Sequence, residues 1–268
     1  MKLSTLQGQP ASILGLAGQQ SMDAVTVAFA FEAAINYFFF YNLESENFLD
    51  GLKLLLAVKR EQVLVATGSE DRDISSLRHY LDSVRHHLDV DRVDVFFAEY
   101  VSFADDMTQV QVLLDELCSW KDKGLVRYVG VTTHNRAIAS EMIERHQCDV
   151  LMHRYNMAHR QAEQNVLPAA QKAGIPVVAF TCTRWVTLLK GHPNWKKEPP
   201  TAADCYRYVL HHPGISLALT APKTRQQLEA NLSVLHAPQL QAQEIANWRK
   251  YGNLIYGTGQ DTFDTQWI

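Results

Sequence analysis

Eight short apolar runs, each followed by a stretch with helix-like character, constrain the fold of this chain more than any other feature. Strands that alternate with helices form a parallel sheet, because a parallel neighbour is reached only through a long crossover connection. Eight such units in 268 residues predict a closed (β/α)8 barrel, the TIM barrel, for which about 250 residues are typical. The runs are ILGLAG (13–18), INYFFFYN (35–42), QVLVATG (62–68), RVDVFFAE (92–99), VRYVGVTTH (126–134), DVLMHRYN (149–156), IPVVAFTC (175–182) and ISLALTAPK (215–223).

The segments between the runs carry helix signals. Leu77, Leu81, Val84 and Leu88 recur at the spacing of one helix face, after a capping residue at Asp73 or Ser75. No linker or low-complexity segment divides the chain. We therefore expect one barrel domain over residues 1–268, with a C-terminal helix and tail from about residue 236.

Composition excludes several classes of function. The 25 basic and 29 acidic residues give a net charge of −4, without the clustered Lys and Arg of a nucleic-acid-binding protein. The longest apolar stretch is interrupted by Glu32 and Asn36, so we expect no membrane span, and the N-terminus lacks the apolar centre of a signal peptide. Four widely spaced cysteines, with no CxxC pair, are typical of reduced thiols in a cytoplasmic protein. The oligomeric state is not predicted.

The chemistry of such a barrel lies where strands end, at its carboxyl face. Glu99 ends the fourth run beside Phe39 and Phe97, so desolvation is expected to raise its pKa and make it a general acid. The alternative is a structural carboxylate paired with Arg154 or Arg127. We expect a small-molecule ligand at this face.

A metal site is the other interpretation of these strand ends. His134, His153 and Glu99 would supply the three ligands that zinc requires. No tight spacing such as HxH or HExxH supports that set, and we expect no metal.

Several segments, in order and spacing, resemble the aldo-keto reductases, a barrel family that reduces carbonyls with NADPH. The resemblance covers residues 1 to about 235. The segments that carry it are WKDKGLVRYVGVTTHN (120–135), CDVLMHRYN (148–156), AGIPVVAFTC (173–182), HPGISLALTAPKTRQQLEANL (212–232) and INYFFFYN (35–42).

The resemblance also implies that the family's catalytic set is missing. That set is a Tyr acid, an Asp and a Lys that tune it, and a His that orients the carbonyl. The matching positions hold Glu44, Phe39, Gly68 and Glu99 in that order, and Tyr41 is the nearest phenol. A phenol has a pKa near 10 and needs a neighbouring ammonium to donate a proton near neutrality. We expect carbonyl reduction by the family's usual route to be lost or severely weakened.

The positions that bind the cofactor are better retained. The resemblance implies that the start of the last helix holds the 2′-phosphate and adenine of NADP(H), a suitable place for an anion. Ala230 replaces an acidic residue that often binds the adenine amine. The implied cofactor-binding residues are Thr132, Thr133, His153 and Phe180 at the nicotinamide and Lys223, Gln227 and Asn231 at the phosphate and adenine. A solvated basic helix start is the alternative for the last three.

Three hypotheses for function follow. The first is a divergent NADP(H)-binding oxidoreductase in which Glu99, Tyr41 or His153 supplies the acid. The second is a catalytically inactive pseudoenzyme that acts as a binding or regulatory protein. The third is a redox-neutral lyase, isomerase or hydrolase that uses Glu99 and His153.

Overall fold

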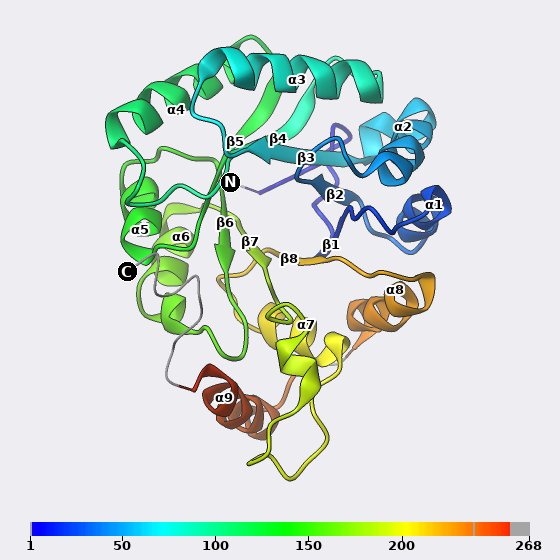
Figure 1. The fold of residues 1–268 in the computed structure, drawn as a ribbon, viewed down its shortest axis with the longest axis vertical. Helices are drawn as coiled ribbons and strands as arrows, with labels where there is room; N and C mark the ends of the chain where they lie inside the picture. The colour runs from blue at the N-terminus through cyan, green and yellow to red at the C-terminus, as the bar shows by residue number, and fades with distance from the viewer. Residues whose placement is uncertain (1, 238, 258–268) are drawn as a thin grey trace.

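The computed structural model describes residues 2–237 and 239–257, and its strands close into a parallel barrel in sequence order, with β1 paired to β8 (Figure 1). Each of the eight apolar runs coincides with one strand, with β3 extending one residue past its run, so the predicted (β/α)8 fold is confirmed. The strands are β1 (Leu14–Ala17), β2 (Tyr37–Phe40), β3 (Leu64–Ser69), β4 (Val93–Ala98), β5 (Val126–Thr133), β6 (Val150–Arg154), β7 (Val177–Phe180) and β8 (Leu217–Thr220).

Helices surround the strands, as Figure 1 shows. The predicted cap at Asp73 is present, because its carboxylate accepts a hydrogen bond from the Ser76 N–H at 2.8 Å. The α-helices are α1 (Ala24–Glu32), α2 (Glu46–Lys59), α3 (Ile74–Leu88), α4 (Met107–Asp122), α5 (Arg136–Glu144), α6 (Val166–Ala173), α7 (Ala202–Leu210), α8 (Arg225–Leu232) and α9 (Ala242–Tyr256). Short 3-10 turns lie at η1 (Arg60–Gln62), η2 (Gln161–Gln164), η3 (Thr187–Lys190) and η4 (Ser233–His236).

Two apolar cores explain why the strand sequences are almost continuously apolar. Alternate residues of one strand face opposite sides of the sheet. On β2, Tyr37 and Phe39 belong to the core inside the barrel, whereas Phe38 and Phe40 belong to the core between barrel and helices. Because both faces are buried, no polar alternation is left in these runs.

The amino end of the barrel is closed by paired charges. Asp94 is fully buried near the start of β4, and its two oxygens accept hydrogen bonds from Arg60, Arg127 and the Val65 N–H. Arg127 also donates to the Ser4 carbonyl of the N-terminal segment. This end is therefore fixed by hydrogen-bonded ion pairs.

Helix α9 packs against the loops at the other end. The Tyr251 hydroxyl donates to the Leu188 carbonyl at 2.6 Å, and Arg160 of the loop after β6 donates to the Arg249 carbonyl at 2.9 Å. Gly252 allows this approach, since a Cβ there would lie 1.9 Å from the Met157 carbonyl oxygen. Within the described residues, no helix combines the length and apolar character that a bilayer crossing needs.

Candidate functional site

Two positions, on β2 and β3, match the Asp and the Lys of the family that the sequence resembles. Here they are tightly packed and hold no charged side chain. Phe39 is fully buried inside the barrel, edge-on to Tyr41 with ring centroids 4.7 Å apart. Gly68 has no room for a side chain, because a Cβ would lie 2.4 Å from the Phe97 carbonyl oxygen and 2.8 Å from Cγ of Glu99. Glu44 is exposed and accepts a hydrogen bond from Gln20. Neither the Asp nor the Lys of the family has an equivalent at these positions.

Glu99 follows β4 and is 2% exposed. Burial, together with the nearby charge of Glu70, raises its pKa well above the usual value, while Arg72 opposes this shift. Arg72 itself pairs with Asp105 at 2.8 Å and donates to the backbone carbonyl of Glu99. Among the described residues, Oε1 of Glu99 has no hydrogen-bond partner. The structure thus places a buried carboxyl with a raised pKa at the carboxyl end of the barrel, and one of its oxygens has no partner among the described residues.

The alternative that pairs Glu99 with Arg127 is wrong. Arg127 lies at the amino end of the barrel and pairs with Asp94 at 2.8 Å. Arg154 ends β6 and is buried at the carboxyl end. The sequence could not separate these arginines by depth, because both belong to strands.

Two tyrosines stand next to Glu99. The rings of Tyr41 and Tyr100 are stacked with centroids 6.4 Å apart. Burial raises the pKa of both hydroxyls, and the charge of Glu99 adds to the shift. Neither phenol is therefore an effective acid near neutral pH. The sequence analysis named Tyr41 but missed Tyr100, which follows β4 with a left-handed φ of 52°.

Tyr100 contacts aromatic rings that lie at the ends of several strands. The Val101 N–H donates to the Thr132 carbonyl at 2.8 Å and fixes the loop after β4 against β5. The Tyr100 ring is stacked on His134 at 5.7 Å and lies edge-on to Phe180 at 6.4 Å. Phe180, the residue expected to stack on nicotinamide, thus contacts the protein's own aromatic rings.

The threonines that end β5 differ in their hydrogen bonding. Oγ1 of Thr132 is buried and has no hydrogen-bond partner among the described residues. Oγ1 of Thr133 accepts from the Asn135 N–H at 3.0 Å, at the start of α5. The Thr133 hydroxyl therefore already has a partner in the fold, whereas that of Thr132 has none among the described residues. The resemblance implied the same role for both.

His153 on β6 is buried and neutral. Its Nδ1 lies 2.7 Å from the Thr133 carbonyl oxygen, so Nδ1 carries the proton and Nε2 is an acceptor. Burial lowers its pKa to about 4, with the charges of Arg154 and Arg136 adding to the effect and the hydrogen bond to Thr133 opposing it. Near neutral pH His153 is a base or hydrogen-bond acceptor, which makes it unsuitable as the proton donor that the first hypothesis allowed.

The predicted phosphate-binding residues lie around the start of α8. Lys223 is exposed, and its backbone N–H donates to Oε1 of Gln227 at 2.8 Å. Asn231 is buried and donates to the Thr220 hydroxyl at 3.0 Å. The Lys223 ammonium is therefore exposed to solvent, whereas Asn231 has a structural contact inside the protein.

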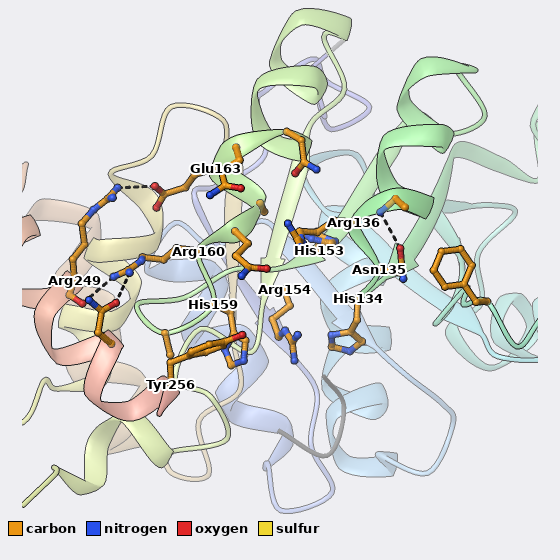
Figure 2. A pocket seen from close by; sticks show the side chains of 18 residues that line it. His134, Asn135, Arg136, His153, Arg154, His159, Arg160, Glu163, Arg249 and Tyr256 are labelled. Carbon is orange, nitrogen blue, oxygen red and sulfur yellow. Dashed lines mark hydrogen bonds and ion pairs between the residues drawn. The ribbon is translucent and has the colours of Figure 1, made fainter. Parts of the chain in front are cut away.

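A cavity of about 800 Å³ opens beside the mouth, between the ends of β5 and β6, the loop after β6 and α9 (Figure 2). His134 and His153 line it together with Arg136, Arg160 and Arg249. The sequence analysis missed this arginine cluster, because its members come from separate elements and no motif connects them.

The remaining reactive groups give no further site. Within residues 2–237 and 239–257, no group of three or more His, Cys, Asp or Glu side chains is arranged to hold a metal ion. Cys182 is buried, and burial raises its pKa to about 12. It is a packed thiol at neutral pH.

The model of the Aldo/keto reductase family matches residues 19–192. The chain belongs to this family. Curated protein sequences contain no match to it. Among solved structures, aldo-keto reductase AKR11C1 from Bacillus halodurans in its holo form is similar with a TM-score of 0.77 and 17% identity, over 97% of this chain and 99% of that one. The apo form of the same protein gives a TM-score of 0.73 at 17% identity, over 97% and 99% of the two chains.

A third similar structure is an aldo/keto reductase from Klebsiella pneumoniae, solved in complex with NADP and acetate. Its TM-score is 0.77 at 14% identity, over 94% of this chain and 95% of that one. Identities this low support a shared fold and carry no residue roles. The functional argument for this chain therefore rests on its own side chains.

Proposed function

We propose that this chain is an NADP(H)-binding oxidoreductase in which Glu99, in place of a lysine-activated tyrosine, supplies the proton. The observation that carries the proposal is the buried Glu99 carboxyl, whose pKa is raised by burial and whose Oε1 has no partner among the described residues. A buried polar atom without a partner is costly and is retained where a ligand completes it.

Two features of the chain fit the cofactor. Oγ1 of Thr132 is a second buried polar atom without a partner among the described residues, and a threonine hydroxyl can bind a carboxamide. Lys223 is exposed beside the start of α8, where the helix dipole adds to the attraction for a phosphate. Support for NADP(H) also comes from family membership and from the NADP held by the Klebsiella protein.

The chemistry assigned to Glu99 is a single proton transfer. When bound, NADPH would supply the hydride for an electron-poor carbon of a carbonyl or conjugated double bond. The O–H bond of Glu99 breaks, and its proton goes to the substrate atom that receives the displaced electron pair, which leaves a carboxylate that takes up a proton from solvent. A carboxyl with a raised pKa suits this role near neutral pH.

The first experiment is a titration with NADPH, followed by nucleotide fluorescence and by thermal unfolding. We expect saturable binding that Lys223→Ala weakens about tenfold, as for the loss of a charged contact to phosphate. Lys53→Ala, at an exposed lysine of α2, is the matched control and should bind as the parent does. Absence of binding at about 1 mM NADPH, an affinity already very weak, would contradict the proposal.

The second experiment separates binding from chemistry. Glu99→Gln keeps the shape of the side chain but removes the transferable proton. We expect it to bind NADPH like the parent and to lose at least about a hundredfold of any turnover found on carbonyl and enone substrates, the range for a general acid. Equal turnover in both proteins would remove Glu99 from the reaction.

A second candidate function, a binding protein without chemistry, is favoured by the packing of Tyr100 against Phe180 and His134 at the mouth. It predicts no turnover on any substrate and the same ligand binding in Glu99→Gln as in the parent. The redox-neutral hypothesis with Glu99 and His153 stays a prediction.

A further inference from the structure

The cavity beside the mouth concentrates positive charge in a chain that is negative overall. The described residues that line it include four arginines and one acid, Glu163, whereas the whole chain has a net charge of −4. Figure 2 shows Arg249 and Arg160 along one wall, next to α9, and Arg136 with Asn135 along the opposite wall. At about 800 Å³, the cavity has the size of a small-molecule site.

The single acid is already neutralised. Glu163 pairs with Arg249 at 2.7 Å through one carboxylate oxygen, and its other oxygen accepts from the Tyr155 hydroxyl at 2.8 Å. Arg136 and Arg160, which belong to the same lining, therefore give the cavity a positive local potential. Low-dielectric walls strengthen such a potential in a cleft.

Two arginines of the lining are positioned by the fold. Arg160 donates to the Arg249 carbonyl and to the Asn253 side chain, both on α9, so its planar group is fixed at the wall. Arg154 is the last residue of β6 and is 8% exposed. Rigid positioning of a guanidinium reduces the entropy lost when it binds an oxyanion.

Arg136 is the first residue of α5 and lies half-buried in the cavity wall. Within residues 2–237 and 239–257, it makes no ion pair. It also sits at the positive end of the α5 dipole, which adds to its attraction for an anion. A half-buried arginine without a carboxylate partner, in a cavity, is a ready partner for a ligand oxyanion.

We propose that this cavity binds the anionic group, a carboxylate or a phosphate, of a small organic molecule. The site does not depend on the proposed reduction. His134 lines the cavity and also contacts Tyr100 and Phe180, so a molecule anchored here extends toward the barrel mouth. An arginine-rich wall favours planar oxyanions because the guanidinium offers paired donors.

The experiment is calorimetric titration of the full chain, without nucleotide, with inorganic phosphate and with succinate, and with succinamide as the neutral control. We expect saturable binding of at least one anion, weaker at high ionic strength, and no binding of succinamide. Preference for phosphate or for succinate distinguishes the two kinds of ligand. No binding of either anion at about 10 mM, or equal binding of succinamide, would overturn the proposal.

The variants locate the site. Arg136→Gln should weaken anion binding about tenfold, while Arg145→Gln, at the exposed far end of α5, should leave it unchanged. Lys53→Ala, at an exposed lysine of α2, should also leave it unchanged. If Lys223→Ala abolishes anion binding, the anion occupies the start of α8 and the proposal is wrong.

A measurement on the unmutated chain tests the position of the site without relying on variants that could fail to fold. The ring signals of His153 and His159, which both line the cavity, should shift in NMR spectra as phosphate or succinate is added. Shifts confined to histidines outside the cavity, such as His79 on α3, would contradict the assigned position.

Discussion

Two buried carboxyl groups at opposite ends of β4 show how the two ends of this barrel differ. Asp94, near the start of β4, and Glu99, just after its end, are both almost inaccessible to water. Both oxygens of Asp94 accept hydrogen bonds, from Arg60, Arg127 and a backbone N–H. Oε1 of Glu99 has no partner among the described residues. Burial alone therefore does not distinguish the two acids, whereas their hydrogen bonding does.

The largest expected effect lies at the paired end. Asp94→Asn should lower the free energy of unfolding by about 3 kcal/mol, because it leaves two arginines without their carboxylate. Urea unfolding of the variant and of the parent measures this difference in the free energy of unfolding. A loss below about 1 kcal/mol would show that the pairing contributes little and would break the comparison.

The next largest effect is expected at Gly68, where neighbouring atoms leave no room for a side chain. Gly68→Ala should lower the free energy of unfolding by about 2 kcal/mol, since its new methyl group would clash with the Phe97 carbonyl oxygen at 2.4 Å and with Cγ of Glu99 at 2.8 Å. Ser69→Ala, the next residue on β3, is the control and should change stability by less than about 1 kcal/mol. Equal stability of Gly68→Ala and the parent would show that the strands can move apart.

His153 lies at the carboxyl end of the barrel, and its lowered pKa should make the free energy of unfolding depend on pH. Its pKa is lowered from 6.5 to about 4 in the folded chain, so the unfolded chain binds the extra proton first. Its stabilising contribution is fully present above pH 6.5 and is lost as pH falls toward 4, by roughly 1 kcal/mol for each pH unit. The difference in unfolding free energy between His153→Gln and the parent should therefore depend on pH in this window. A constant difference would mean that His153 titrates normally.

Glu99 should give the smallest effect on stability, with the opposite sign. Its folded pKa lies above the ordinary 4.5, so the folded chain retains the proton and loses stability as pH rises above 4.5. Glu99→Gln removes this loss. The variant should match the parent at pH 4.5 and become progressively more stable than it at higher pH, as thermal unfolding across the pH range would show. A higher unfolding temperature for the parent than for Glu99→Gln at pH 8 would indicate that Glu99 is a paired, ionised carboxylate.

The sequence predicted the barrel well and the site in part. Strands such as DVFFA are apolar on both faces because helices cover one side and the barrel core fills the other. Their positions can therefore be located from the continuous apolar runs in the sequence. Glu99 was found because a strand end is a defined place in this fold. The role of Tyr100 could not be found, since it depends on a loop conformation with positive φ.

The arginine cavity was beyond sequence reasoning for a different reason. Arg160 and Arg249 are 89 positions apart in the chain and meet only because α9 docks on the loop after β6. No periodicity encodes that contact. In the same way, nothing in the helix pattern of α8 revealed that Asn231 is buried against Thr220.

The tight space at Gly68 also has a historical consequence. A substitution that introduced a lysine here would place its Cβ against the Phe97 carbonyl oxygen, on the backbone of the adjacent strand. A lysine at this position would therefore require compensating changes in β4 before it could be tolerated. Evolution by one substitution at a time would find that route closed.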